Sequence, residues 1–292
     1  MAQERLNQLP AVSFGSAQVT RLISGGNPLC GGSHWSAKRS REMVEYHTPE
    51  RVVAYLHRLA ECGINTIQAR GDYHRILHWL ELFRREGGQL HWIAQTASEM
   101  HDVFQNIRIL ASAGAMAIYH HGSNTDRFWV EGRIDEAEDY LKCMRDQGVR
   151  VGLATHHPEV IEYVEEKGWD LDFYMACFYN VNREVRESEI VANRQRAIDG
   201  GADDPFPSVN EDFRDDDPPR MIRVIQAVDK QCLAFKILGA GRRCGTPGDV
   251  ADAFRYAYAN IKPRDIVVVG MWQKYRDEIA LNVGHVLDAL DS

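Results

Sequence analysis

The stretch "VRVGLATHHPEVIEYVEEKG" (149–168) contains one complete strand-and-helix unit. Its apolar first half predicts a buried strand that ends in the histidine pair His156 and His157. Pro158 then opens a segment in which apolar residues recur at helical spacing, and Gly168 ends it. A buried strand followed directly by an amphipathic helix is the repeating unit of parallel α/β folds.

The same unit recurs along the chain. Apolar runs predict eight strands, over residues 19–26, 64–70, 90–97, 115–121, 149–157, 171–180, 232–241 and 265–271. Helical patterns lie between them, over residues 48–63, 133–148, 157–168 and 246–261. This alternation predicts an α/β fold, a (β/α)8 TIM barrel, with residues 1–292 as a single domain. An open doubly wound sheet is the main alternative, but the glycine-rich stretch 24–35 lacks the GxGxxG spacing of its nucleotide sites.

Residues 181–219 interrupt the alternation after the sixth predicted strand. The segment is polar and acid-rich, and loops of this length are uncommon unless they are functional or disordered. Because barrel sites lie at the carboxyl ends of the strands, we expect this acidic insertion to form a lid loop over that end. A solvated insertion or an oligomer contact is the alternative.

Composition narrows the class of protein. The chain has 292 residues, a net charge of −8 and 44% hydrophobic residues, which is typical of a soluble globular protein. The acidic balance disfavours a nucleic-acid partner, because phosphate binding requires a basic surface. No apolar run approaches the roughly 20 residues of a membrane helix, no secretory pattern is visible, and the cysteines show no CxxC spacing. We therefore expect a cytoplasmic protein with a small-molecule substrate, no membrane partner, and either a monomeric or a homo-oligomeric state.

Polar side chains follow the predicted strands at their carboxyl ends, where the sites of such barrels lie. The residues expected to carry the chemistry are Tyr73, His120, His156, His157 and Lys236. A second set is expected to bind the substrate, namely Asn27, His34, Trp35, Gln68, Arg70, Tyr179, Asn180 and Arg242. Neighbouring side chains on a strand point to opposite faces, so only one histidine of each adjacent pair can serve the mouth of the barrel.

The histidines suggest two kinds of chemistry. His120 and His156, together with Glu99, would form an N,N,O ligand set for a divalent ion such as zinc or manganese, although no HExxH motif supports it. Without a metal, the imidazoles would act as general acid and base. Lys236 and Arg242 would then hold an anion or a developing oxyanion, or Lys236 would act as a base or Schiff-base nucleophile.

Several segments resemble one known family in chain order. They include "SFGSAQVTRLISGGNPLCGG" (13–32), "LAECGINTIQARGDY" (59–73), "IYHHG" (118–122) and "FKILGAGR" (235–242), and the resemblance extends over nearly the whole chain. The family is the aldo-keto reductases. The resemblance implies a barrel with an N-terminal β-hairpin that reduces carbonyls with NADPH through an Asp, Tyr, Lys and His tetrad. It matches Tyr73 to the tyrosine and His120 to the histidine, so that His120 faces the site and His121 points outward.

Two positions depart from the family pattern. Gln68 stands where the resemblance expects the aspartate, and Thr96 stands near the expected lysine. Without these partners Tyr73 should titrate near the ordinary tyrosine value of roughly 10, which argues against typical hydride transfer. The closing segment "GMWQKYRDEIALN" (270–282) also lacks the family's turn, although Lys274 and Arg276 remain as candidate ligands of a cofactor phosphate.

Three functions follow as alternatives. The first is a non-redox enzyme, an isomerase, epimerase or lyase that transfers protons on a carbohydrate-like or hydroxy-carbonyl small molecule, with Tyr73 as a hydrogen-bond donor. The second is a divergent NADPH-dependent aldo-keto reductase. The third is a catalytically inactive barrel with a regulatory or scaffold role.

Overall fold

The computed structural model describes residues 9–72, 75–97, 100, 102–183 and 211–291. Within them, eight parallel strands close into a barrel in the order β10-β3-β4-β5-β6-β7-β8-β9, which confirms the predicted (β/α)8 fold. The strands are β3 (Leu22–Gly25), β4 (Thr66–Arg70), β5 (His91–Gln95), β6 (Ala117–His120), β7 (Arg150–Thr155), β8 (Phe173–Cys177), β9 (Gln231–Phe235) and β10 (Ile266–Gly270). Each predicted apolar run overlaps one of them, and β9 begins one residue before its predicted run.

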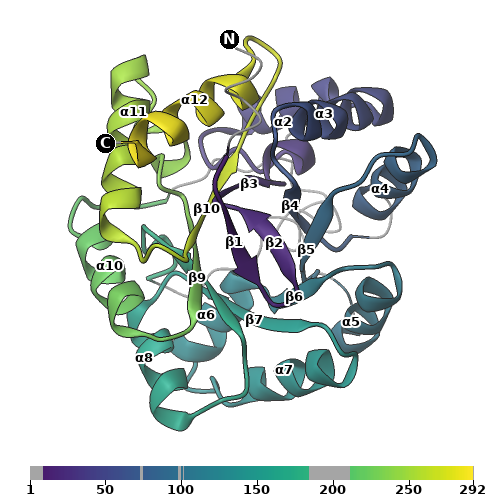
Figure 1. The fold of residues 1–292 in the computed structure, drawn as a ribbon. Coiled ribbons are helices and arrows are strands. Elements are labelled where there is room, and N and C mark those ends of the chain that lie inside the picture. The colour runs from purple at the N-terminus through teal and green to yellow at the C-terminus, as the bar shows by residue number, and fades with distance from the viewer. Residues whose placement is uncertain (1–8, 73–74, 98–99, 101, 184–210, 292) are drawn as a thin grey trace.

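Helices surround the barrel as an outer layer (Figure 1). They are α2 (Ala37–Tyr46), α3 (Pro49–Glu61), α4 (Ile76–Arg85), α5 (Val103–Ser112), α6 (Gly122–Val130), α7 (Glu136–Asp146), α8 (Pro158–Lys167), α10 (Asp217–Ala227), α11 (Pro247–Asn260) and α12 (Glu278–Leu290). Two short 3-10 turns, η1 (Pro28–Cys30) and η2 (Gly239–Gly241), follow β3 and β9. No helix in these described ranges is long and apolar enough to cross a membrane.

An antiparallel hairpin precedes the barrel, as the resemblance implies. It consists of β1 (Ala11–Phe14) and β2 (Ala17–Thr20) and lies across one end of the barrel (Figure 1). Phe14 and Val19 are fully buried, and the Phe14 ring packs edge-on against Phe173 with ring centres 5.1 Å apart. Apolar side chains of the hairpin therefore close the amino-terminal end of the barrel, which leaves the carboxyl end for a ligand.

The barrel interior corrects the expected orientation of His120. Ala117 and Tyr119 belong to the apolar cluster inside the barrel, so the next residue along β6 points outward. The His120 ring stacks on Tyr140 with ring centres 5.0 Å apart, and its Nδ1 lies 2.8 Å from Thr125 Oγ1. His120 thus lies between β6 and the helices and away from the mouth, and burial lowers its pKa to about 4. His121, expected to point outward, follows the strand and caps α6 by accepting a hydrogen bond from the Ser123 N–H.

Gly152 on β7 provides a test of packing inside the barrel. A Cβ added there would lie 2.3 Å from Phe173 Cζ, and that ring is held between Phe14 and Tyr119. We predict that Gly152→Ala lowers the free energy of unfolding by about 1–3 kcal/mol, as overpacked cores do, measured by urea denaturation.

The matched control is Gly284→Ala in α12, where an added Cβ meets no atom within 4 Å. This variant should gain up to about 1 kcal/mol, because alanine favours a helix more than glycine does. Combining Gly152→Ala with Phe173→Leu should cost less than the sum of the two single changes. A Gly152→Ala variant as stable as the parent would contradict this account of the interior.

The buried His120 should make stability depend on pH. The pKa of His120 is about 6.5 in the unfolded chain and about 4 in the folded protein. Between these pH values the unfolded state binds a proton at this histidine and the folded state does not. Stability is therefore lost as the pH falls from about 6.5 to about 4, by on the order of 3 kcal/mol from this group. We predict that His120→Gln flattens the fall in unfolding free energy over this range. Replacement of the exposed His78 by Gln should leave the fall unchanged, and equal slopes for the two variants would refute the assignment.

Candidate functional site

A cavity of about 760 Å³ opens at the carboxyl end of the barrel. It lies at the ends of β3, β4, β9 and β10 and continues between η2, α11 and the start of α12. Loops after the seventh and eighth strands commonly form ligand sites in this fold, and β9 and β10 hold those places here. Seven residues expected from the sequence line the cavity: Asn27, His34, Trp35, Gln68, Lys236, Arg242 and Arg276.

Three polar side chains from separate segments form a hydrogen-bonded row at this cavity. Lys236 Nζ lies 3.1 Å from His34 Nε2, and His34 Nδ1 lies 2.9 Å from a carboxylate oxygen of Glu211. Asn27 Nδ2 also lies 3.0 Å from His34 Nε2. An ionised carboxylate can only accept, so Nδ1 carries the proton and the Nε2 lone pair faces the lysine and the amide. We call Glu211, His34 and Lys236 the mouth relay.

Burial strengthens the inner end of the mouth relay. The Glu211 side chain is fully buried, whereas His34 keeps 16% of its side-chain surface exposed. Lys236 is half-buried at the first position after β9. The buried carboxylate therefore orients an imidazole whose other nitrogen meets an ammonium at the cavity wall, which is the arrangement that orients histidine in proton transfer.

Backbone strain is concentrated at the same wall. Within the described ranges, three residues other than glycine have positive φ: His34 (52°), Lys236 (59°) and Ala240 (52°). All three line the cavity. A left-handed backbone costs roughly 1–2 kcal/mol for a residue with a side chain, and such residues cluster at functional sites. The strain points to this cavity independently of the titratable groups.

A second polar cluster is centred on Asp126 of α6. Its carboxylate accepts hydrogen bonds from Thr155 Oγ1 at 2.6 Å and from Asn182 Nδ2 at 2.7 Å. His156 Nδ1 lies 2.6 Å from the same carboxylate, and the backbone N–H of His156 donates to it at 3.1 Å. We call Asp126 and His156 the buried dyad.

The buried dyad holds a neutral imidazole beside a carboxylate. Burial lowers the pKa of His156, and the charge of Asp126 only partly opposes this. Burial acts to raise the pKa of Asp126, but the His156 ring and the Thr155 hydroxyl hold it below its usual value. The ring therefore donates Nδ1–H to the carboxylate and keeps a lone pair on Nε2, as a histidine general base does.

The two clusters are neighbours. The His156 ring packs edge-on against Phe235, whose own ring lines the cavity next to Lys236, with ring centres 5.6 Å apart. The charges of Lys236 and Glu211 also act on the pKa of His156. His34 therefore lines the cavity and His156 lies behind Phe235, outside the cavity lining, and each imidazole has a carboxylate on its Nδ1 side.

Several expected site residues instead hold the loop after β8 in place. His157 Nε2 donates to the Asn182 carbonyl oxygen at 2.8 Å, and Asn180 Nδ2 lies 3.3 Å from His157 Nδ1. The Tyr179 hydroxyl accepts a hydrogen bond from Arg243 at 3.4 Å. His157, Tyr179 and Asn180 are all buried and lie outside the cavity lining, so they position the loop.

Arg242 anchors the cavity wall. Its guanidinium lies 3.7 Å from the centre of the Phe213 ring and 5.3 Å from that of Trp35. It also donates to the His34 carbonyl oxygen at 3.1 Å. Arg242 thus holds the backbone of His34 in its left-handed conformation, in addition to facing the cavity.

The interior below the cavity has its own polar chain. Gln68 Nε2 donates to Tyr119 Oη at 2.6 Å, and Tyr119 Oη donates to Gln95 at 2.9 Å. Burial raises the pKa of Tyr119, and the charge of the half-buried Arg70 opposes this only in part. Tyr119 therefore stays protonated. Thr96, near the position where the resemblance expects a lysine, accepts the backbone N–H of His121 at 3.0 Å.

The expected metal set is not assembled. His120 points out of the barrel, His156 is bonded to Asp126, and Glu99 lies outside the described residues. Among the residues that the structure describes, no group of three or more His, Cys, Asp or Glu side chains is placed to hold a metal ion. The zinc or manganese ligands expected from the sequence therefore do not fit, because His120 and His156 lie on different sides of the strands.

Of the two expected cofactor ligands, Lys274 and Arg276, one lines the cavity. Lys274 pairs with Glu42 on α2 and does not line the cavity, whereas Arg276 lines it and lies 3.3 Å from Glu278. Tyr73 lies outside the described residues, as does most of the expected lid at 181–219. The described ends of that segment supply Asn182 and Glu211 to the two clusters.

Sequence reasoning missed three side chains of these two polar clusters. Glu211 is one of many acidic residues in the insertion. It is 177 residues from His34 in the sequence, and only the folded structure shows that the two side chains are in contact. Asp126 lies on α6, four residues beyond its first residue Gly122, and Asn182 lies next to the start of the insertion. Only Asp126 had a usable signal, because a carboxylate near the start of a barrel helix lies close to the mouth.

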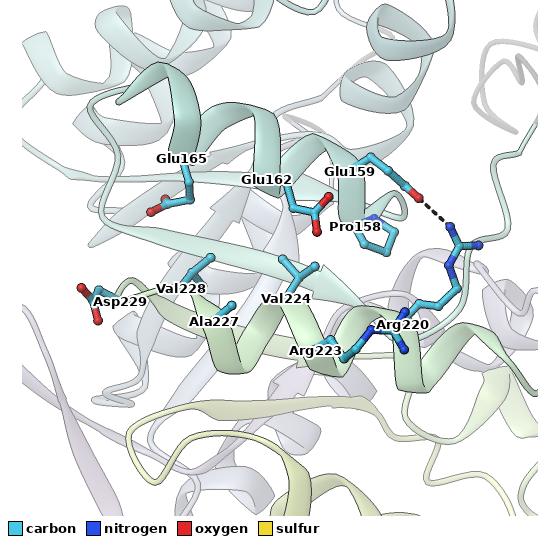
Figure 2. Close-up of a pocket in the computed structure, with 10 residues that line it drawn as sticks. All are labelled: Pro158, Glu159, Glu162, Glu165, Arg220, Arg223, Val224, Ala227, Val228 and Asp229. Carbon is cyan, nitrogen blue, oxygen red and sulfur yellow. Dashed lines mark hydrogen bonds and ion pairs between the residues drawn. The ribbon is translucent and has the colours of Figure 1, made fainter.

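Another cavity, of about 640 Å³, lies on the outer surface between α8 and α10 (Figure 2). Glu159 and Arg220 form an ion pair at 2.6 Å across it. The other charged groups lining it are Glu162, Glu165, Arg223 and Asp229. Both walls are solvated helix faces without the residues of either polar cluster, so we place the candidate site at the mouth.

No family model and no curated protein matches the sequence. Among solved structures, the chain is similar to a protein named "Putative aldo-keto reductase" from Pseudomonas aeruginosa, with a TM-score of 0.60, 16% identity, and coverage of 97% of this chain and 96% of that one. It is also similar to a truncated 3-deoxy-D-arabino-heptulosonate 7-phosphate synthase from Thermotoga maritima, with a TM-score of 0.53, 13% identity, and coverage of 97% and 91%. At these identities the comparisons establish that the chain shares the TIM-barrel fold of both proteins.

Proposed function

We propose that this protein is a non-redox enzyme that transfers protons on a hydroxy-carbonyl or carbohydrate-like small molecule, as an isomerase, epimerase or lyase does. The observation that carries the proposal is the mouth relay, in which Glu211, His34 and Lys236 are joined by hydrogen bonds of 2.9 and 3.1 Å at the cavity wall. The structural likeness supports the barrel fold alone, and this fold serves many different reactions. The choice of a proton-transfer reaction is supported by the residues of the mouth relay.

The relay supplies what proton abstraction beside a carbonyl needs. Such a reaction requires a base for the C–H proton and an electrophile for the negative charge that develops on the carbonyl oxygen. In the proposal the Lys236 ammonium stabilises that oxygen, and His34 Nε2 accepts the proton. Glu211 then stabilises the imidazolium through Nδ1–H, which is the role of a carboxylate partner of histidine.

The buried dyad gives the proposal a second proton-transfer group. An isomerase or epimerase must remove a proton at one position and return one at another. His156, with its Nε2 lone pair, lies next to Phe235 at the cavity and is held by Asp126. His34 takes the place that the sequence interpretation assigned to His120, because His120 is buried among Tyr140 and Phe128.

Deuterium exchange tests the proposal without knowledge of the natural substrate. The purified protein is incubated in D2O with glyceraldehyde, dihydroxyacetone and pentoses, free and phosphorylated, and the C–H signal next to the carbonyl is followed by NMR. We predict exchange that depends on the protein and that falls by about 10²–10⁴-fold in His34→Gln and in Lys236→Met. The control variant His57→Gln, on the outer helix α3, should retain the parental rate.

The same samples separate the alternatives. Exchange without nicotinamide that is lost in the two mouth variants supports the proposal. No exchange across the panel, or exchange that both variants retain, overturns it. Saturable NADPH binding with carbonyl-dependent NADPH oxidation would instead establish the divergent reductase, for which Arg276 is the expected cofactor ligand that lines the cavity.

The dyad predicts a pH effect with a definite sign. The charge of Asp126 raises the pKa of His156, so Asp126→Asn should lower that pKa further. A base must be unprotonated to act, so the acidic limb of the exchange rate should move to lower pH in Asp126→Asn. The rate itself should fall, because the amide does not hold the Nδ1–H tautomer. An unmoved acidic limb would exclude His156 as the second base of the proposed reaction.

A further inference from the structure

We infer that Lys236 is a covalent catalyst that forms an imine with the carbonyl carbon of its substrate, so that the substrate class is an aldehyde or ketone. This inference rests on the proposed function and goes further, because it makes the electrophile of the proposed reaction an iminium ion. It is carried by the contacts of the Lys236 amine with the residues around it.

The amine has a proton acceptor in direct contact. A lysine attacks a carbonyl only after it loses its proton, so a nucleophilic lysine needs an adjacent base or a low pKa. His34 Nε2 lies 3.1 Å from Lys236 Nζ. The Nδ1–H bond to the buried Glu211 fixes the tautomer in which Nε2 accepts, so the proton has a defined path from nitrogen to nitrogen.

The partner of the lysine is unusual for a structural lysine. A lysine that serves stability is normally solvated or paired with a carboxylate. In the part of the chain that the structure describes, Lys236 Nζ forms its hydrogen bond with the ring nitrogen of His34, and the carboxylate of Glu211 bonds the other nitrogen of that ring. Lys230 and Lys262 provide the contrast, because each pairs directly with an acid, at 2.7 Å to Glu165 and 3.1 Å to Asp265.

The position of Lys236 suits attack on a bound carbonyl. It follows the buried strand β9 and lines the cavity of about 760 Å³. Its φ of 59° turns the chain sharply at the strand end, and Ile237 beside it is buried. A side chain on a rigid strand end is held more precisely than one on a loop, and a covalent step needs that precision.

The proposed step balances in protons and atoms. His34 Nε2 takes a proton from the Lys236 ammonium, and the neutral amine attacks the carbonyl carbon as the C–O π pair moves to oxygen. A proton passes from the nitrogen to that oxygen and gives the carbinolamine. The imidazolium of His34 then protonates the hydroxyl group, which leaves as water as the nitrogen lone pair forms the C=N bond. Ammonium plus carbonyl thus becomes iminium plus water, and His34 returns to its neutral form.

Reductive trapping tests the inference on the whole 292-residue chain. The protein is incubated with glycolaldehyde or dihydroxyacetone, reduced with borohydride, and mapped by peptide mass spectrometry. We expect one secondary-amine adduct on Lys236 at near-stoichiometric yield, formed at least about tenfold more slowly in His34→Gln. Lys236→Arg keeps the positive charge but cannot form an imine, because the guanidinium does not deprotonate, and it should lose the adduct. The control Lys230→Arg, whose lysine pairs with Glu165 outside the barrel, should be labelled like the parent.

Each result has one meaning. An adduct pattern that is the same in the parent and in Lys236→Arg, or no adduct on Lys236 in the parent, overturns the inference. If trapping fails while deuterium exchange persists in Lys236→Arg, the proposed function stands with a non-covalent lysine. If trapping on Lys236 succeeds while no exchange occurs, the imine inference stands and the proposed proton-transfer function falls. Thermal unfolding of both lysine variants verifies that they fold.

Discussion

The packing of the N-terminal hairpin into one end of the barrel is the constraint on which the site depends. Phe14 and Val19 are buried with Phe173 at that end, and Gly152 leaves the space that the Phe173 ring requires. With this end filled by hydrocarbon, inward-facing polar side chains can be solvated or bind a ligand only at the other end. The cavity, the mouth relay and the buried dyad all lie at that end.

Successive side chains along each strand point alternately into the barrel and toward the surrounding helices, so neighbouring polar residues lie in different environments. On β6 the inward residue is Tyr119, which joins Gln68 and Gln95 below the cavity, and the outward residue is His120, which stacks on Tyr140. Two adjacent titratable side chains of one strand thus have unrelated roles. One belongs to the floor of the site, and the other is a neutral part of the packing between strand and helix.

The sequence was sufficient for the fold and for part of the site. Eight apolar runs separated by helical patterns predicted the barrel, because that alternation has few other solutions. It placed His34, Gln68 and Lys236 at the mouth, because they lie at or after the carboxyl ends of apolar strands. It could not orient His120, since adjacent histidines carry no information about which faces inward. Glu211 could not be singled out among the acids of 181–219, because its role comes from a contact across the fold.

The mouth relay also ties reactivity to completion of the fold. His34 and Lys236 are separated by 202 residues and His34 and Glu211 by 177, and Glu211 reaches the ring from the segment that precedes α10. Neither a nascent chain nor a partly folded barrel can bring the three groups together. Under the proposed imine chemistry, the lysine gains its proton acceptor only once these long-range contacts have formed, so its amine lacks that activation in the unfolded chain.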